Sequence, residues 1–395
     1  MISLENGTSL RVLEDFQSKL CDADAAVLRV PTNLSLGGAF GVPAGIIQLI
    51  GAWARTQPNP TLQFHAGLAN ADYFQSLANT PHGMVAIYFA QSIRNPSDGS
   101  IISARPYRSY LIPPVMAMQQ NQFQKTMGGR GVFLCCFAGA RNEYIRPFYP
   151  REDGEKIRSR SDFRLLTDNA LEAFAPEALR RFIPNDLDNL SLLIYELFSN
   201  THDHARVDVN GSVISRSVRG ILLKHIPKGY GARERDFNAS DVALNRYLTR
   251  ALARDETPRT VTKSHQLSKA FLEITVFDTG PGLVRRWLSA QSQATNLASI
   301  KVEEEFEVVR SCFSEHVTTK SILGSGQGLP TVLETLKKLR AFLRLRTGRL
   351  CLVQDFSEPT SVDFSLKHWL AAKPLLPDTL GAVYSIVVPL SSSQS

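Results

Sequence analysis

The sequence predicts an α/β protein built from two parts, and three observations support this. Strand-like runs alternate with helix-like runs over residues 1–150, as in an open α/β layer. Residues 165–390 contain an amphipathic helix, a strand with period-two alternation and two glycine-rich turns. The 395 residues are 43% hydrophobic and 21% charged, which excludes a chain that is disordered over its length. This length also fits two or three domains of about 150 residues each.

Four short runs define the elements of the N-terminal part. Residues 26–31 (AVLRVP) and 61–66 (TLQFHA) have the composition of strands, and they flank an apolar helix expected over residues 42–55. Residues 84–90 (MVAIYFA) and 131–138 (GVFLCCFA) are two further β-rich runs. β-Branched and aromatic residues of this kind favour strands. The runs therefore predict a sheet in the N-terminal part, in which no motif indicates a chemistry.

One apolar stretch raises the question of a membrane segment. No charged residue occurs from Gly37 to Ala54, a length at the lower edge of a membrane-spanning helix. Pro43 and Gln48 interrupt the stretch, so we expect a buried core helix and no association with a membrane. The five cysteines form no CxxC pair, and the N-terminal residues lack the apolar core of a secretory signal. Together these features predict a cytoplasmic protein with reduced thiols.

A polar connector joins the two parts, and the second part carries a basic insertion. Residues 146–163 are rich in proline and charge, which predicts a linker over 151–164. Basic residues crowd between 229 and 269, in either a solvated helix-and-loop excursion or a surface for a protein partner or for nucleic-acid phosphates. Few aromatic residues, Tyr247 among them, accompany the basic ones, so nucleic acid has the weaker support. We expect residues 391–395 (SSSQS) to form a loose tail.

An amphipathic helix expected over residues 186–206 carries one polar stripe. Its apolar side chains share a face that should pack on a sheet. Glu196, Asn200 and Asp203 fall together on the neighbouring stripe. An amide oxygen can bind Mg²⁺ beside nucleotide phosphates, and a nearby carboxylate can activate water. The alternative is an ordinary amphipathic helix with solvated acids. We expect His202 on the surface.

A strand over residues 272–278 ends in a glycine-rich turn, DTGPGL. Apolar and polar residues alternate along the strand. Asp278 stands where the strand ends, and a carboxylate there can accept a hydrogen bond from the exocyclic amine of adenine. Gly280 and Gly282 free the backbone to turn and to approach a flat ligand. A purely structural turn is the alternative interpretation.

A second glycine-rich loop, SILGSGQGLP, precedes another helix. Gly324, Gly326 and Gly328 lead into Leu329 and Pro330. Backbone N–H groups at such a helix start can bind phosphate oxygens, helped by the helix dipole. The loop is not a Walker loop, because no GK[ST] follows it, and it does not follow the first strand of a Rossmann unit. A flexible hinge is the alternative interpretation.

Taken together, three segments resemble the nucleotide-binding boxes of the GHKL superfamily, which joins gyrase B subunits, heat-shock chaperone ATPases, histidine kinases and MutL-type repair proteins. The segments follow the family's order: ELFSNTHDHA (196–205), DTGPGL (278–283) and TTKSILGSGQGL (318–329). The resemblance covers residues 165–390 and implies a Bergerat-type two-layer α/β sandwich, with helices on one face of a mixed sheet. It also implies a terminal strand at 381–390 and a nucleotide lid over 282–324.

The resemblance assigns a role to each matching residue. Glu196 would activate water, Asn200 would bind Mg²⁺ and Asp278 would bind adenine. The remaining matching positions would contact the nucleotide: Asp203, Gly280, Gly282, Lys320, Gly324, Gly326, Gly328 and Leu329. The implied activity is Mg²⁺-dependent binding and hydrolysis of ATP. Closure of the lid would signal to the N-terminal part, to a protein partner or to a second copy of the chain.

Two other functions stay open at this level. The first is a kinase that phosphorylates a serine or a histidine of a separate protein. No histidine in the sequence has the setting of a phosphoacceptor helix, which disfavours a kinase that phosphorylates itself. The second is a non-catalytic switch whose bound nucleotide gates the binding of a partner. The N-terminal strand–helix–strand run resembles a STAS-like module.

Overall fold

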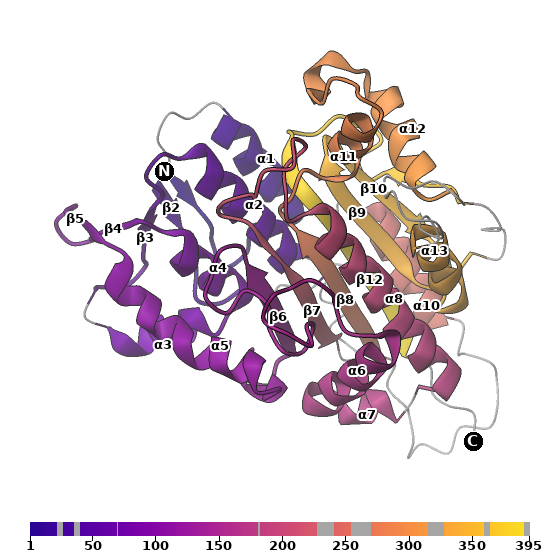
Figure 1. Cartoon of the computed structure of the whole chain (residues 1–395), viewed down its shortest axis with the longest axis horizontal. Coiled ribbons are helices and arrows are strands. Elements are labelled where there is room, and N and C mark those ends of the chain that lie inside the picture. Colours follow the sequence, from indigo (N-terminus) through magenta and orange to yellow (C-terminus); the bar gives the residue numbers. More distant parts are fainter. Residues whose placement is uncertain are drawn as a thin grey trace.

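The chain folds around two β-sheets, as the computed structural model shows (Figure 1). The prediction of a mixed α/β protein is therefore confirmed. The structure describes these residues: 1–21, 27–34, 40–68, 70–180, 182–226, 241–253, 270–314, 328–358 and 364–390.

The first sheet has five short strands and belongs to the N-terminal part. Four of them pair in parallel in chain order, and the fifth pairs antiparallel with the fourth. The strands are β1 (Ile2–Ser3), β2 (Val27–Arg29), β3 (Thr61–Gln63), β4 (Ser92–Arg94) and β5 (Ile101–Ser103). β2 and β3 confirm the strands predicted at 26–31 and 61–66.

The predicted apolar helix is α2 (Val42–Thr56), and most of its residues are buried. Pro43 occupies its first turn, where the missing N–H costs no hydrogen bond. No helix in the described parts of the chain combines the length and the apolarity that crossing a bilayer requires. The 42–55 stretch is therefore the core helix that the sequence predicted.

The prediction of a strand over residues 84–90 is wrong, because residues 84–89 belong to α4 (Pro81–Phe89) and Ala90 is its C-cap. Thr80 caps this helix, since its hydroxyl accepts the N–H of Gly83 at 3.1 Å. Nearly every side chain of α4 is buried. A helix without a polar face shows no helical periodicity, so its apolar run has the same appearance as a buried strand.

The second sheet has seven strands, and each neighbouring pair is antiparallel, where a mixed sheet was predicted. Its strand order is β11 (Lys367–His368), β10 (Leu350–Asp355), β9 (Phe342–Gly348), β12 (Thr379–Leu390), β8 (Ala270–Asp278), β7 (Val218–Ile226) and β6 (Val132–Phe137). β8 and β12 confirm the strands predicted at 272–278 and 381–390.

β6 belongs to the second sheet, although it precedes the predicted boundary near residue 150. It confirms the strand expected at 131–138, but it pairs with β7 in the seven-stranded sheet and not with the N-terminal strands. Its predicted place in the first sheet is therefore wrong. The predicted boundary near residue 150 does not coincide with the change from one sheet to the other. The predicted linker over 151–164 also overlaps the start of a helix at Arg160.

Helices cover both faces of the seven-stranded sheet, where the prediction placed them on one. One face carries a group of three packed helices, α6 (Arg160–Phe174), α8 (Pro184–His204) and α13 (Gly328–Lys338). The opposite face is covered by α1 (Leu10–Cys21), α2 and α10 (Val242–Ala253).

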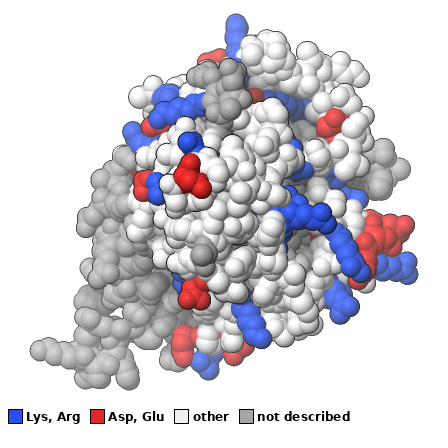
Figure 2. All heavy atoms as spheres, turned by 90° about the vertical axis from the view of Figure 1, so that its left-hand side faces the viewer, with Lys and Arg blue, Asp and Glu red and all other residues white. Residues whose placement is uncertain are grey.

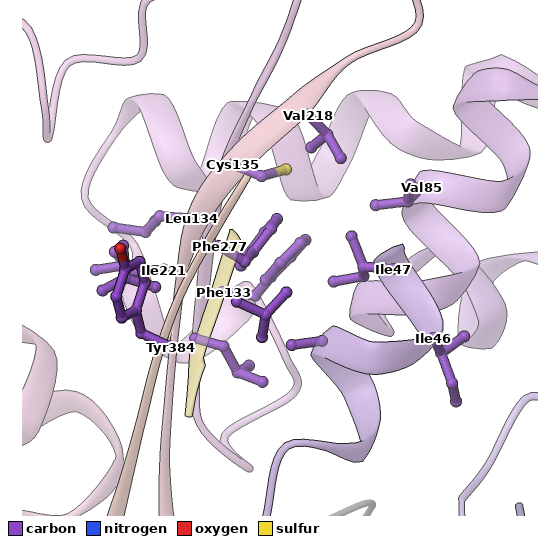
Figure 3. Close-up of a cluster of buried hydrophobic side chains, with 14 of the residues drawn as sticks. Ile46, Ile47, Val85, Phe133, Leu134, Cys135, Val218, Ile221, Phe277 and Tyr384 are labelled. Carbon is purple, nitrogen blue, oxygen red and sulfur yellow. The ribbon is translucent and has the colours of Figure 1, made fainter. Parts of the chain in front are cut away.

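The alternation of side chains along the strands separates the two faces. Phe133 and Phe277 lie on the side of α2, near Ile47, whereas Leu134 and Ile221 lie on the other side of the strands (Figure 3). The rings of Phe133 and Phe277 stack with their centroids 6.0 Å apart. The sheet is therefore the middle layer between two helical layers.

The face under α1 and α2 is charged although it is buried. Glu273 is fully buried and accepts the N–H groups of Phe40 and Gly41, at 2.8 and 2.6 Å, where α2 begins. Arg346 donates to both carboxylate oxygens of Glu14, at 2.9 and 2.8 Å. Bidentate pairs of this kind fix the orientation of both side chains. Polar contacts thus join the N-terminal helices to the second sheet.

Part of the predicted basic insertion packs on this same face. Tyr247 of α10 is fully buried, and its hydroxyl donates to the Val387 carbonyl at 2.9 Å. Arg250 forms ion pairs with Asp355 at 2.6 Å and with Glu358 at 2.8 Å. Within α10 the prediction of a solvated excursion is therefore wrong, and Tyr247 is not free to stack on a nucleic-acid base. Residues 227–240 and 254–269 lie outside the described part of the chain.

Candidate functional site

The predicted helix 186–206 is α8, and two residues of its polar stripe share a buried edge. Glu196 is 7% exposed, and its Oε1 accepts a hydrogen bond from Arg160 at 2.6 Å. The amide nitrogen of Asn200 is buried and has no hydrogen-bond partner among the described residues. A buried amide without a partner is costly, and a ligand that meets it relieves this cost. Asp203 is exposed and accepts from the Ser199 hydroxyl at 3.4 Å.

The N-terminus of α13 lies against this edge. A Cβ placed on Gly328 would be 3.2 Å from Glu196 Oε2 and 3.6 Å from Asn200 Oδ1. The first turn of this helix offers the N–H groups of Gly328 and Leu329, and a helix N-terminus favours an anion. Leu329 follows in the same turn and is half-buried. Three other predicted loop positions lie outside the described residues: Lys320, Gly324 and Gly326.

Asp278 is buried at the end of β8. Its Oδ1 accepts the N–H of Gly280 at 2.8 Å. Burial raises the pKa of Asp278 to about 6, although the N–H groups of Gly280 and Ala382 and the charge of Arg55 act in the opposite direction. The carboxylate is therefore mainly ionised at neutral pH, in the form that accepts hydrogen bonds.

The glycine turn after Asp278 lies against the end of α8. A Cβ on Gly280 would be 2.6 Å from the Cα of Ala205, so only glycine allows this approach. Gly282 has a φ of +82°, which a side chain would strain. Both positions therefore need glycine, as predicted. At Gly280 the close neighbour is Ala205, at the end of the protein's own helix α8.

The predicted lid over 282–324 begins with two helices, α11 (Leu283–Ala290) and α12 (Val302–Cys312). Arg286 of α11 donates to the His204 carbonyl at 2.8 Å, at the end of α8. This contact gives a carbonyl in the last turn of the helix a side-chain donor. The start of the predicted lid is therefore fixed to α8.

The described parts of the three predicted boxes meet along α8. Gly328 lies at Glu196 and Asn200, and Gly280 lies at Ala205. Glu196 and Ala205 are nine residues apart, which is about 14 Å along a helix axis. The two contacts therefore lie at different points along the same helix.

α2 contacts the Asp278 turn from the N-terminal part. Arg55, near the end of α2, donates to the Thr279 carbonyl. A Cβ on Gly51 would be 2.8 Å from Thr279 Cγ2. Arg216 donates to the Ala54 carbonyl at 2.6 Å. A movement of the Asp278 turn would therefore displace α2, because these contacts join the two segments directly.

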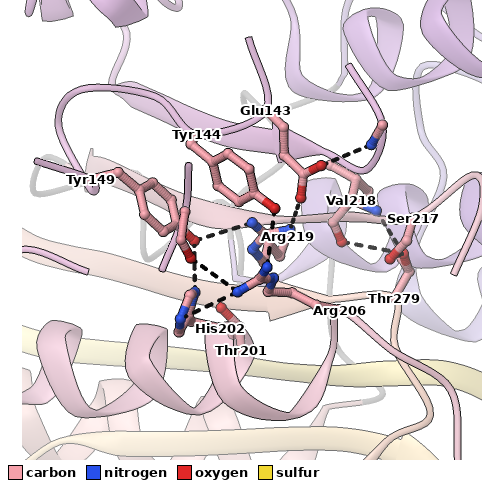
Figure 4. Close-up of polar contacts among 12 residues, drawn as sticks. Glu143, Tyr144, Tyr149, Thr201, His202, Arg206, Ser217, Val218, Arg219 and Thr279 are labelled. Atoms are coloured by element: carbon pink, nitrogen blue, oxygen red, sulfur yellow. Dashed lines mark hydrogen bonds and ion pairs between the residues drawn. The ribbon is translucent and has the colours of Figure 1, made fainter. Parts of the chain in front are cut away.

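A buried cluster that the sequence analysis missed lies beside Asp278. His202, expected on the surface, is 8% exposed, and its Nδ1 is 3.2 Å from the Tyr149 hydroxyl (Figure 4). Arg219, opposite Asp278 in the β7–β8 register, donates to the same hydroxyl at 3.1 Å. Arg206 is 3.5 Å from His202 Nε2. Both ring nitrogens of His202 thus face polar groups, and their donor and acceptor roles depend on the tautomer.

The electrostatics of this cluster keep His202 neutral. Burial, followed by the charge of Arg206, lowers the pKa of His202 to about 4. The cluster also holds the predicted connector in place, because Tyr149 belongs to the 146–163 segment and its side chain is 1% exposed. Its only sequence signal is the pair of aromatic residues in RPFYP, inside a segment that otherwise has the composition of a linker.

Neither the surface charge nor the comparisons with known proteins identify a ligand or a family for this site. Within the described chain, no three His, Cys, Asp or Glu side chains form a group that could hold a metal ion. The predicted Mg²⁺ would depend on Asn200 and on phosphate oxygens. On the face shown in Figure 2, basic and acidic side chains are interspersed. Comparisons with protein-family models, with curated proteins and with solved structures found no match to this chain.

Proposed function

We propose that this chain binds ATP with Mg²⁺ through a GHKL-type, Bergerat-like site and hydrolyses it. The observation that carries the proposal is the approach of Gly328 to Glu196 and Asn200, which are more than a hundred residues away in the sequence. The amide nitrogen of Asn200, which has no partner among the described residues, and the ionised carboxylate of Asp278 add one polar group for each end of the nucleotide.

Each residue has a distinct task in this proposal. Asp278 accepts a hydrogen bond from the adenine amine, and the first N–H groups of α13 bind phosphate oxygens. Asn200 offers its Oδ1 to Mg²⁺, which neutralises phosphate charge when bound. Glu196 accepts a proton from water at Oε2, the oxygen that Arg160 does not contact. The water oxygen bonds to the terminal phosphorus while the bond from that phosphorus to ADP breaks.

Calorimetry of ATP binding tests the proposal. We expect the wild type to bind ATP, and to bind it more tightly with Mg²⁺. Asp278→Asn should weaken binding by about 10- to 100-fold, because a hydrogen bond to a charged acceptor is lost. Asp98→Asn, at an exposed carboxylate of the N-terminal part, is the matched control and should change nothing. A wild type that binds no ATP, or equal affinity in both variants, would refute the proposal.

The pKa of Asp278 predicts how affinity depends on pH. Below pH 6 the carboxyl is protonated and loses acceptor capacity, so affinity for the base should fall as the pH falls. Adenosine is the suitable probe, because it has no phosphate that titrates in this range. Its dissociation constant should be about tenfold higher at pH 5 than at pH 8, and Asp278→Asn should remove this dependence. A flat profile for the wild type would contradict the assignment of Asp278.

A nucleotide-gated switch is the second candidate function, and the contact between Arg55 and Thr279 favours it. That contact couples the proposed adenine turn to the N-terminal part without any need for turnover. Incubation with ATP labelled on the γ-phosphate separates the functions. Free labelled phosphate supports hydrolysis, label on a separate protein supports a kinase, and binding without either supports the switch.

A further inference from the structure

Arg160 is the first residue of α6 and contacts the carboxylate that we propose as general base. A capping box fixes the start of this helix. The Ser159 hydroxyl accepts the N–H of Asp162 at 3.2 Å, and the Asp162 carboxylate accepts the N–H of Ser159 at 3.0 Å. The backbone of Arg160 is therefore held in place before its side chain makes any contact.

The guanidinium of Arg160 is held by two contacts with α8. Its Nη2 is 2.6 Å from Glu196 Oε1, and its Cζ is 5.5 Å from the centre of the Tyr195 ring. The side chain of Arg160 is 65% exposed, whereas that of Glu196 is 9% exposed. Ion pairs between two exposed partners contribute little. Here one partner is a buried carboxylate, which depends on its counter-ion much more strongly.

The pairing divides the two oxygens of Glu196 between two neighbours. Oε1 faces Arg160, and Oε2 faces Gly328 at the N-terminus of α13. A rotation of the carboxylate would break the bond to Arg160 and turn Oε2 away from α13. The ion pair thus sets the direction in which Oε2 points.

We propose that Arg160 is a positioning residue for Glu196, an inference that rests on the proposed ATP hydrolysis. Arg160 acts from the solvent side of the pair and holds the carboxylate so that Oε2 is available to the attacking water. It contributes to the rate of the chemical step and not to the affinity for nucleotide.

The test measures ATP turnover and ATP binding separately on Arg160→Gln and Arg160→Lys. We expect Arg160→Gln to lower kcat by about 10- to 100-fold, as for other losses of orientation, and to change the dissociation constant of ATP by less than about twofold. Arg160→Lys, which keeps a cation, should recover part of kcat. The control is Arg180→Gln, which removes an exposed arginine paired with Glu177 at 2.8 Å, and its kcat should equal that of the wild type.

A double variant distinguishes positioning from a general structural effect. If Arg160 acts through Glu196, Arg160→Gln combined with Glu196→Ala should have the same residual rate as Glu196→Ala alone. Additive losses, an unchanged kcat in Arg160→Gln, or a loss confined to affinity would each overturn the inference and leave the proposed function standing. A wild type that binds ATP without turning it over would overturn both hydrolysis and the role of Arg160.

Discussion

Replacing Glu196 with alanine should abolish ATP hydrolysis while ATP still binds. General-base catalysis contributes about 100- to 10,000-fold to a rate, so phosphate release should fall by that factor. The affinity for ATP should stay within about twofold, because the adenine and phosphate contacts that we propose come from Asp278 and α13. Phosphate release and calorimetry on the same preparation measure the two effects.

Glu172→Ala is the control for this experiment, since Glu172 is an exposed carboxylate on the neighbouring helix α6. It should release phosphate at the wild-type rate. Equal rates in Glu196→Ala and the wild type would remove Glu196 from the mechanism. A loss of ATP binding in Glu196→Ala would instead assign this residue to the binding of nucleotide.

Replacing Glu273 with glutamine should strongly destabilise the fold. The buried carboxylate accepts two N–H groups at the start of α2, and one oxygen would become an amide that faces one of these donors. Lys224 and Arg344 would also lose a nearby negative charge. Removal of one member of a buried charged group costs about 3–5 kcal/mol. Urea unfolding should show this loss as a lower midpoint, with Glu172→Gln unchanged as the control.

The opposite result is equally informative. If Glu273→Gln unfolds at the wild-type midpoint, the contact between α2 and the second sheet does not contribute to stability. The slope of the transition should be compared as well, because a changed slope indicates a changed extent of unfolding and not a changed stability alone.

The sequence predicts best those elements whose periodicity has one clear meaning. The 42–55 helix, the 186–206 helix and the strands at 272–278 and 381–390 all occur where they were expected. The glycines of DTGPGL also predicted a turn after the 272–278 strand, where Gly282 has a positive φ. For the candidate site, spacing alone placed Glu196 and Asn200 on one edge of a helix.

The failures concern contacts between distant segments. Nothing within residues 131–138 specifies which sheet the strand joins, because a fully apolar run fits any buried position. Alternation along the 272–278 strand placed Glu273 on a polar face without specifying what covers that face. In the structure α1 and α2 bury that face. His202 was misplaced for the same reason, because its partner Tyr149 lies in a segment with the composition of a linker.

The interlocking of the two parts has a practical consequence for anyone who dissects this protein. A recombinant fragment that starts at residue 165 would lack β6, so the outer edge of β7 would be open to pairing with other molecules. It would also expose to water a strand surface whose charges are arranged to meet Glu14 and the start of α2. Biochemistry on the isolated C-terminal half would then report on aggregation, and the chain of 395 residues is the appropriate reagent.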